Sequence, residues 1–85
     1  MYVVLLEYAA AQYGLYVGRT GLTPEARYTN HKAGHRASRQ VTHFGIGLLP
    51  ALYHHLNPLD DDSAELAEVE LAEALRTTGF KVRQG

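Results

Sequence analysis

Short apolar runs bounded by glycine recur along the chain and predict its strands. Tyr2–Tyr8 is rich in β-branched and aromatic residues and predicts one strand, and Gly14–Gly18 predicts a second. We expect these two strands to pair antiparallel through a turn at residues 10–13. On one face of the first strand, the two-residue period places Tyr2, Val4, Leu6 and Tyr8. Val41–Leu49 predicts a third strand and Phe80–Arg83 a short final one.

Helix signals separate these strands. Thr23 can cap a helix and Pro24 suits its first position, so we expect a helix that runs to about Ala33 and stops at Gly34. A short helix is expected over Ala51–Leu56.

The strongest helix signal covers Ser63–Thr78, where Asp62 can cap the start, with Glu65 three residues further on, and Gly79 ends the helix. The order of elements predicts a single α+β domain over residues 1–85. In it, helices flank a small three-stranded antiparallel sheet.

One acidic residue of this last helix interrupts its apolar face. At about 100° per residue, that face consists of Ala64, Ala67, Leu71, Ala72 and Leu75. The other acids fall on its flanks or opposite to it, whereas Glu68 falls within it. A buried carboxylate is costly unless it is paired or holds a metal. Two interpretations follow: a glutamate at the edge of the face that extends to solvent, or a functional carboxylate that points at a cation.

Composition is that of an ordinary folded domain, but the charge is segregated. Hydrophobic residues make up 46% and charged residues 20%, with a net charge of −1, which argues against disorder. Five of the 8 basic residues lie between Arg19 and Arg39, and seven of the 9 acids lie between Asp60 and Glu73. A basic segment suits a phosphate-binding surface. The alternative is a pair of solvated faces that balance each other.

Several classes of protein are excluded by what the sequence lacks. Without cysteine there is no disulfide framework and no thiolate metal site, which fits a reducing compartment, and we expect a cytoplasmic protein. No apolar run approaches the roughly 18 residues of a membrane span. The first residues, MYVVLLEY, have no basic start and contain Glu7, unlike a signal peptide.

Arg27 and His31 form a candidate phosphate-binding pair. Four positions apart, they share one face of the predicted first helix. An arginine can clamp phosphate oxygens with its planar fork, and a histidine can donate or exchange a proton.

Taken in order, these segments resemble the GIY-YIG endonuclease family. They are YVVLLE, LYVG, PEARYTNHKAG and AELAEVELAEAL, and the resemblance runs from Tyr2 to Val82. YVG, which begins at Tyr16, is similar to the family's second motif. Arg27 and His31 are similar to its helical arginine and histidine, and HKAGHRAS to its H-x-x-G-x-x-A loop.

The resemblance implies a GIY-YIG-like fold and the hydrolysis of DNA phosphodiester bonds with one Mg²⁺ or Mn²⁺ ion. Glu68 matches the metal-binding glutamate of the family's last helix. Arg27 would neutralise the phosphoryl oxygens, and Tyr16 and His31 would position or deprotonate the attacking water. The DNA backbone would be held by Arg19, Lys32, Arg36 and Arg39. We expect branched or damaged DNA as the partner, in repair, recombination or restriction, with a specificity partner or a homodimer as a further expectation.

The first motif departs from the family pattern. Counting back from Tyr16, the motif's tyrosine falls at Val4, so its hydroxyl is missing unless Tyr2 or Tyr8, on the same strand face, supplies it. Two alternatives to an active nuclease therefore stay open. One is a catalytically weak or inactive domain that binds nucleic acid, and the other is a small protein-interaction module.

Overall fold

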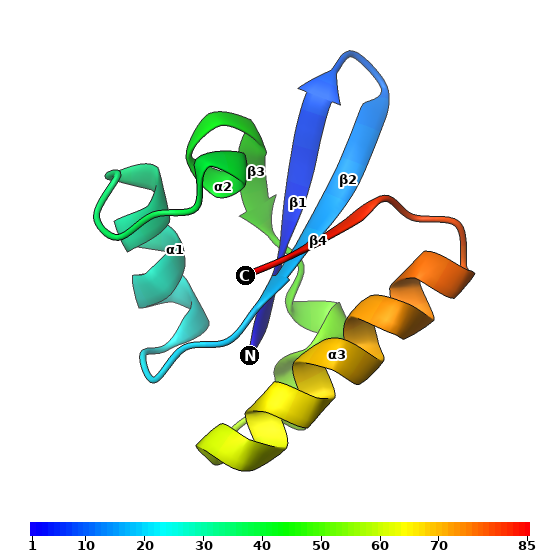
Figure 1. Ribbon diagram of the computed structural model, residues 1–85. Helices are drawn as coiled ribbons and strands as arrows, with labels where there is room; N and C mark the ends of the chain where they lie inside the picture. The colour runs from blue at the N-terminus through cyan, green and yellow to red at the C-terminus, as the bar shows by residue number, and fades with distance from the viewer.

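The computed structural model describes residues 1–85 and has a small α+β fold, with three α-helices around a four-stranded mixed sheet (Figure 1). The strands are β1 (Tyr2–Ala9), β2 (Gln12–Gly18), β3 (Gly45–Leu48) and β4 (Val82–Gln84). The helices are α1 (Pro24–Lys32), α2 (Arg39–Phe44) and α3 (Asp61–Thr77). None of the helices has both the length and the apolar character needed to cross a membrane.

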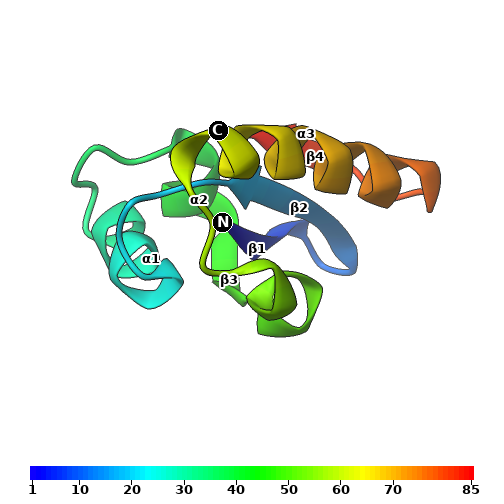
Figure 2. The same ribbon diagram turned by 90° about the horizontal axis from the view of Figure 1, so that it is seen from below.

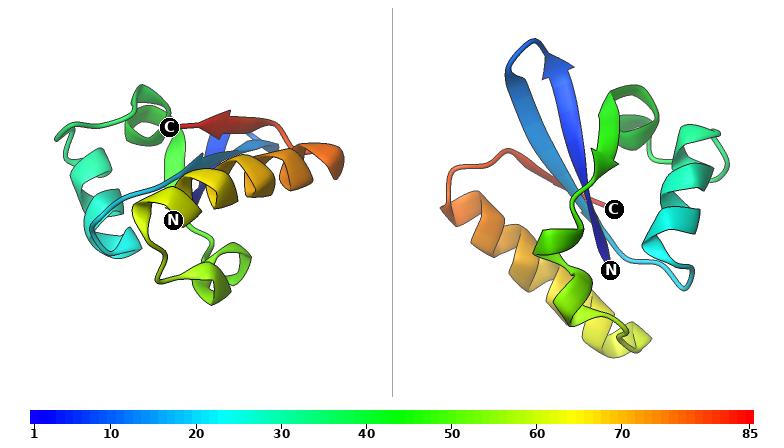
Figure 3. Two further views of the ribbon diagram at one scale, coloured as in Figure 1. Left: turned by 60° about the horizontal axis from the view of Figure 1, so that its bottom comes forward. Right: turned by 180° about the vertical axis from the view of Figure 1, so that it is seen from behind.

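The sheet has four strands, whereas the sequence predicts a sheet of three. Its order is β3-β1-β2-β4; β1 pairs antiparallel with β2 and with β3, whereas β4 runs parallel to β2. The expected three-stranded antiparallel arrangement is thus present as β3-β1-β2, and β4 extends it by one parallel strand. Parallel neighbours need a long crossover, and the chain between β2 and β4 supplies one that ends in α3. In Figure 3, β4 follows the outer side of β2, and β3 forms the opposite edge.

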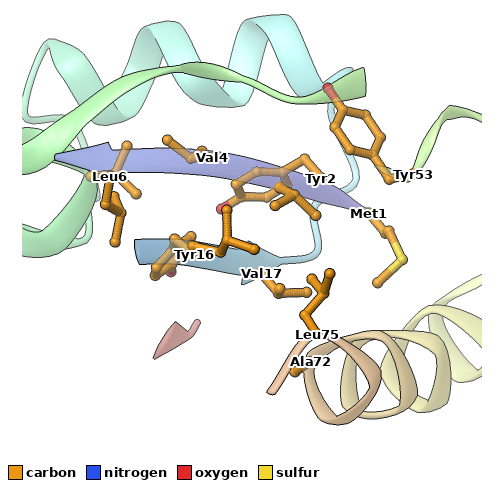
Figure 4. Packing of buried hydrophobic residues seen from close by; sticks show 12 residues of the cluster. Met1, Tyr2, Val4, Leu6, Tyr16, Val17, Tyr53, Ala72 and Leu75 are labelled. Atoms are coloured by element: carbon orange, nitrogen blue, oxygen red, sulfur yellow. The ribbon is translucent and has the colours of Figure 1, made fainter. Parts of the chain in front are cut away.

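Strand register divides the sheet into two faces. Tyr2 lies opposite Gly18 and Val4 opposite Tyr16, so these side chains share one face. This is the face toward α1 and α2. Val17 points to the other face, where Figure 4 shows it beside two buried residues of α3. Figure 2 likewise shows α3 along one side of the β1–β2 hairpin, with α1 apart from it.

Arg39–Phe44 is helical, so the predicted strand Val41–Leu49 is wrong in its first half. The Ser38 side chain accepts a backbone N–H in the first turn of α2 and caps it. At the other end, the Lys32 ammonium donates to two carbonyl oxygens, at 3.2 and 2.9 Å. Lys32, predicted to hold DNA, thus also stabilises the C-terminal end of α2.

The other helices lie close to their predicted positions. Thr23 caps α1, and Gly34 follows its end with φ of +80°. The helix α3 begins earlier than expected, because Asp60 caps it by accepting the Ser63 N–H at 2.7 Å; the prediction that Asp62 is the cap is wrong. Asp62 instead lies in the first turn, where the helix dipole favours negative charge. The short helix predicted over residues 51–56 is present as two 3-10 turns.

The β1–β2 turn gives a test of the backbone geometry. Ala11 has φ of +60°, in the left-handed region, which costs an alanine roughly 1–2 kcal/mol. Glycine removes this cost but adds freedom to the unfolded chain, so Ala11→Gly should raise the free energy of unfolding by up to about 1 kcal/mol. Urea denaturation measures it. Ala10→Gly is the control and should destabilise the protein, since Ala10 has no positive φ. Equal losses in both variants would contradict the turn geometry.

Candidate active site

Two buried side chains meet between β1 and α1. The Tyr2 hydroxyl oxygen lies 2.7 Å from His31 Nε2, and neither residue exposes more than 1% of its surface. Buried polar groups are stable only when their hydrogen bonds are made. This contact satisfies both groups and ties the first helix to the sheet.

The other ring nitrogen of His31 fixes where its proton lies. His31 Nδ1 is 2.9 Å from the backbone N–H of Ser38, which can only donate. Nδ1 is therefore an acceptor, the neutral ring carries its proton on Nε2, and Nε2–H donates to the Tyr2 oxygen. The hydroxyl proton of Tyr2 is left for another acceptor. Burial, with the positive charge of Arg27, lowers the pKa of His31 to about 4, so the ring is neutral at pH 7.

Tyr16 completes a group of three rings. Its ring centroid lies 6.1 Å from that of Tyr2 and 5.8 Å from that of His31. We call these three residues the tyrosine–histidine cluster. Gly18 makes room for it, because a Cβ at this position would lie 2.6 Å from the Tyr2 hydroxyl. The glycine of the YVG motif is thus required by the ring opposite to it.

One tyrosine of β1 brings its hydroxyl group to His31. Val4, where the count along the sequence placed the motif's tyrosine, lies opposite Tyr16 and is fully buried. Tyr2, two residues earlier on the same face, supplies the hydroxyl. Tyr8 does not, because its hydroxyl donates to the Gln40 side chain at 3.1 Å.

Arg27 lies beside the cluster, where its charge acts on both Tyr2 and His31. Its guanidinium donates to the carbonyl of Arg36 at 2.7 Å and to that of His35 at 3.5 Å. These bonds hold the loop after α1 against the helix. The guanidinium has more N–H donors than these two carbonyls use, so it can also bind an anion.

Glu68 is buried, at 5% exposure, on the α3 face where Ala64, Ala72 and Leu75 are also buried. The interpretation as an edge residue extended to solvent is therefore wrong. Its Oε1 atom has no hydrogen-bond partner. Burial raises the pKa of the Glu68 carboxyl, and the positive charge of Arg19 acts in the opposite direction.

The predicted catalytic residues thus fall into two groups. Tyr16, His31 and Arg27 lie together on the face toward α1, with Tyr2 added. Glu68 lies on α3, which covers the other face, and the charges that act on it are those of Arg19, Glu65 and the Met1 ammonium.

The carboxylate of Glu68 fits one ligand position of a hard divalent ion. Mg²⁺ prefers oxygen ligands, keeps several waters and binds through one or two carboxylates. A buried carboxylate oxygen without a partner is the kind of atom that such an ion would satisfy. No group of three or more acidic or histidine side chains is arranged so that it could hold a metal ion.

The basic residues expected to hold DNA differ in their availability. Arg36 and Arg39 are exposed and form no ion pair, and Arg36 has φ of +48°. Arg19 is exposed but lies 3.4 Å from Glu65. Arg36 and Arg39 therefore offer the freest charges on the α1 side.

The last strand covers Tyr16. Arg83 of β4 lies opposite Tyr16, and the Gly85 N–H donates to the Val17 carbonyl at 3.1 Å. A Cβ at Gly85 would overlap the Tyr16 hydroxyl. Tyr16 is consequently only 6% exposed.

Comparisons of this chain with known protein families, with curated proteins and with solved structures find no match. The tyrosine–histidine cluster itself is buried. Arg27, the cationic side chain beside it, lines a hollow together with Arg36, and this pair can bind a phosphate.

The proton position on His31 is directly measurable. Long-range ¹H–¹⁵N NMR spectra at pH 7 should show a neutral His31 ring with its proton on Nε2, and titration should give a pKa of about 4. Because this pKa is lowered, the contribution of His31 to stability is complete above about pH 6.5 and is lost as the pH falls toward 4. An Nδ1–H tautomer, or a titration near pH 6.5, would contradict the Ser38–His31–Tyr2 chain of hydrogen bonds.

Proposed function

We propose that this protein is a GIY-YIG-type endonuclease that hydrolyses DNA phosphodiester bonds with one divalent cation. The observation that carries the proposal is the hydrogen bond between Tyr2 and His31 at 2.7 Å, with Tyr16 and Arg27 beside it. These residues come from the segments whose motifs resemble that family.

In this proposal the side chains divide the work as follows. His31 holds the Tyr2 ring through Nε2–H, and the Tyr2 hydroxyl hydrogen-bonds the attacking water and orients it. The proton that this water loses passes to a phosphate oxygen of the substrate. Because burial raises the pKa of Tyr2, its hydroxyl stays protonated at neutral pH. Arg27 stabilises the negative charge that grows on the phosphoryl oxygens.

Glu68 is the proposed ligand of Mg²⁺ or Mn²⁺. When bound, the ion would polarise the phosphate and stabilise the leaving oxygen. Arg19, next to Glu68 in the structure, would neutralise a phosphate that approaches from this side.

Two features of the structure favour a second function, which is DNA binding without cleavage. Tyr16 is covered by the segment around Gly85, and Glu68 lies apart from the tyrosine–histidine cluster. Incubating the protein with plasmid and branched DNA, with and without Mg²⁺ or Mn²⁺, decides between the two. Metal-dependent nicking supports the nuclease, and binding without nicking supports the second function.

The role of Tyr2 predicts a loss of rate. Tyr2→Phe removes only the hydroxyl, so it should lower the cleavage rate by about 10²–10⁴-fold while DNA binding is kept. Single-turnover cleavage of a labelled duplex measures it. Tyr13→Phe, at a tyrosine that is 51% exposed, is the control and should cleave at the wild-type rate. Wild-type cleavage by Tyr2→Phe would rule out this role.

The role of Glu68 predicts a variant that is folded but inactive. Glu68→Gln should abolish metal-dependent cleavage and leave DNA binding intact. Its free energy of unfolding should hold or rise, because a buried charge is removed. Cleavage assays with urea denaturation measure both effects. Glu70→Gln, at an exposed position of the same helix, should change neither. If Glu68→Gln cleaves normally, Glu68 is not the metal ligand.

A further inference from the structure

Two hollows lie on either side of the loop that joins β2 to α1. The larger, of about 800 Å³, reaches from this loop to the first turn of α3 and to Asn57–Leu59. The smaller, of about 330 Å³, reaches from the loop to Arg27 and Arg36. Thr20 and Leu22 line both hollows and therefore form the ridge between them.

Leu22 is held on this ridge as an exposed apolar side chain. It is 51% exposed, in a loop whose neighbours are mostly polar. Its backbone N–H donates to the Thr20 hydroxyl oxygen at 3.0 Å. The next residue, Thr23, accepts the Ala26 N–H at 3.2 Å and starts α1. Leu22 is thus presented between two hydrogen-bonded turns, with little freedom to fold back.

The hollows have opposite chemical characters. The smaller is lined by Arg27, Arg36, His35 and Asn30 and contains no acid, so it suits a phosphate group.

In the larger hollow three carboxylates face one arginine. Glu65 is paired with Arg19 at 3.4 Å, which leaves Asp61 and Asp62 as free acceptors. Such a wall attracts N–H donors.

We propose that the ridge and its two hollows recognise a nucleotide displaced from the base stack of DNA. Its phosphate lies in the smaller hollow, its base enters the larger one, and Leu22 fills the gap left in the stack. Nucleobase edges carry N–H donors that aspartate can accept. Apolar side chains act as wedges between base steps in several DNA-bending proteins. This inference rests on the proposed DNA-cleaving function and names its substrate as DNA with an unpaired nucleotide.

The energetic cost of moving a base out of the stack predicts a preference for DNA that contains an unpaired nucleotide. Taking a paired base out of the stack costs a few kcal/mol, and least when the base is already unpaired. The protein should therefore bind a duplex with a one-nucleotide bulge at least about tenfold more tightly than the fully paired duplex.

The test measures this ratio by fluorescence anisotropy in EDTA, where metal-dependent cleavage does not occur. Leu22→Ser should lower the ratio to near one by weakening binding to the bulged duplex alone. Leu22→Met keeps an apolar wedge and should keep the ratio. Leu66→Ser makes the same change at a leucine that is 61% exposed on α3, away from both hollows, and should also keep it.

A second readout follows the displaced base itself. With 2-aminopurine at the bulge, fluorescence should rise when wild-type protein binds and the base leaves the stack, and it should not rise with Leu22→Ser. Equal binding of the two duplexes by wild type, or a ratio kept in Leu22→Ser, overturns the inference while DNA cleavage can still stand. Failure to bind either duplex overturns the proposed function as well.

Discussion

The buried hydrogen bond between Tyr2 and His31 fixes how α1, which carries Arg27, lies against the sheet. His31 is fully buried, and both of its ring nitrogens are satisfied, one by β1 and one by the Ser38 N–H at the start of α2. One side chain therefore joins a strand and two helices. Removing either partner would leave a buried polar atom unsatisfied, at a cost of about 1–3 kcal/mol. Arg27, one turn earlier on α1, takes its position beside the cluster from the same anchor.

Local signals predicted the elements that depend on local chemistry. The cap at Thr23, the glycine at position 34 and the periodicity of α3 are properties of neighbouring residues, and they gave α1 and α3 nearly correctly. The same periodicity placed Glu68 on the buried face. The helix α2 was missed because it has only six residues and its end is stabilised by Lys32, which is remote in sequence. The parallel pairing of β4 was missed for the same reason, since nothing local specifies a partner across the sheet.

The tyrosine that reaches His31 could not be identified by counting residues along the chain. The count placed the motif's tyrosine at Val4, and the strand register puts Val4 opposite Tyr16. Counting residues does not show how far a side-chain ring extends across the sheet. Tyr2 approaches His31 because Gly18, directly opposite, has no side chain to exclude it. A tyrosine paired with a glycine across two strands is a signal available in the sequence, but it is recognised only once the register is known.

Glu68 is hard to explain as a structural residue. A buried carboxylate oxygen without a partner is costly, and a leucine at the same position would extend the apolar face of α3. The nearby positive charges lower this cost but do not remove it, since burial still raises the pKa of the carboxyl. A divalent cation with its waters would supply the missing partner directly. The energetic penalty at Glu68 therefore supports its proposed role as a cation ligand. His31, by contrast, is buried with both ring nitrogens satisfied, whereas the buried Tyr53 hydroxyl, like Glu68 Oε1, has no hydrogen-bond partner.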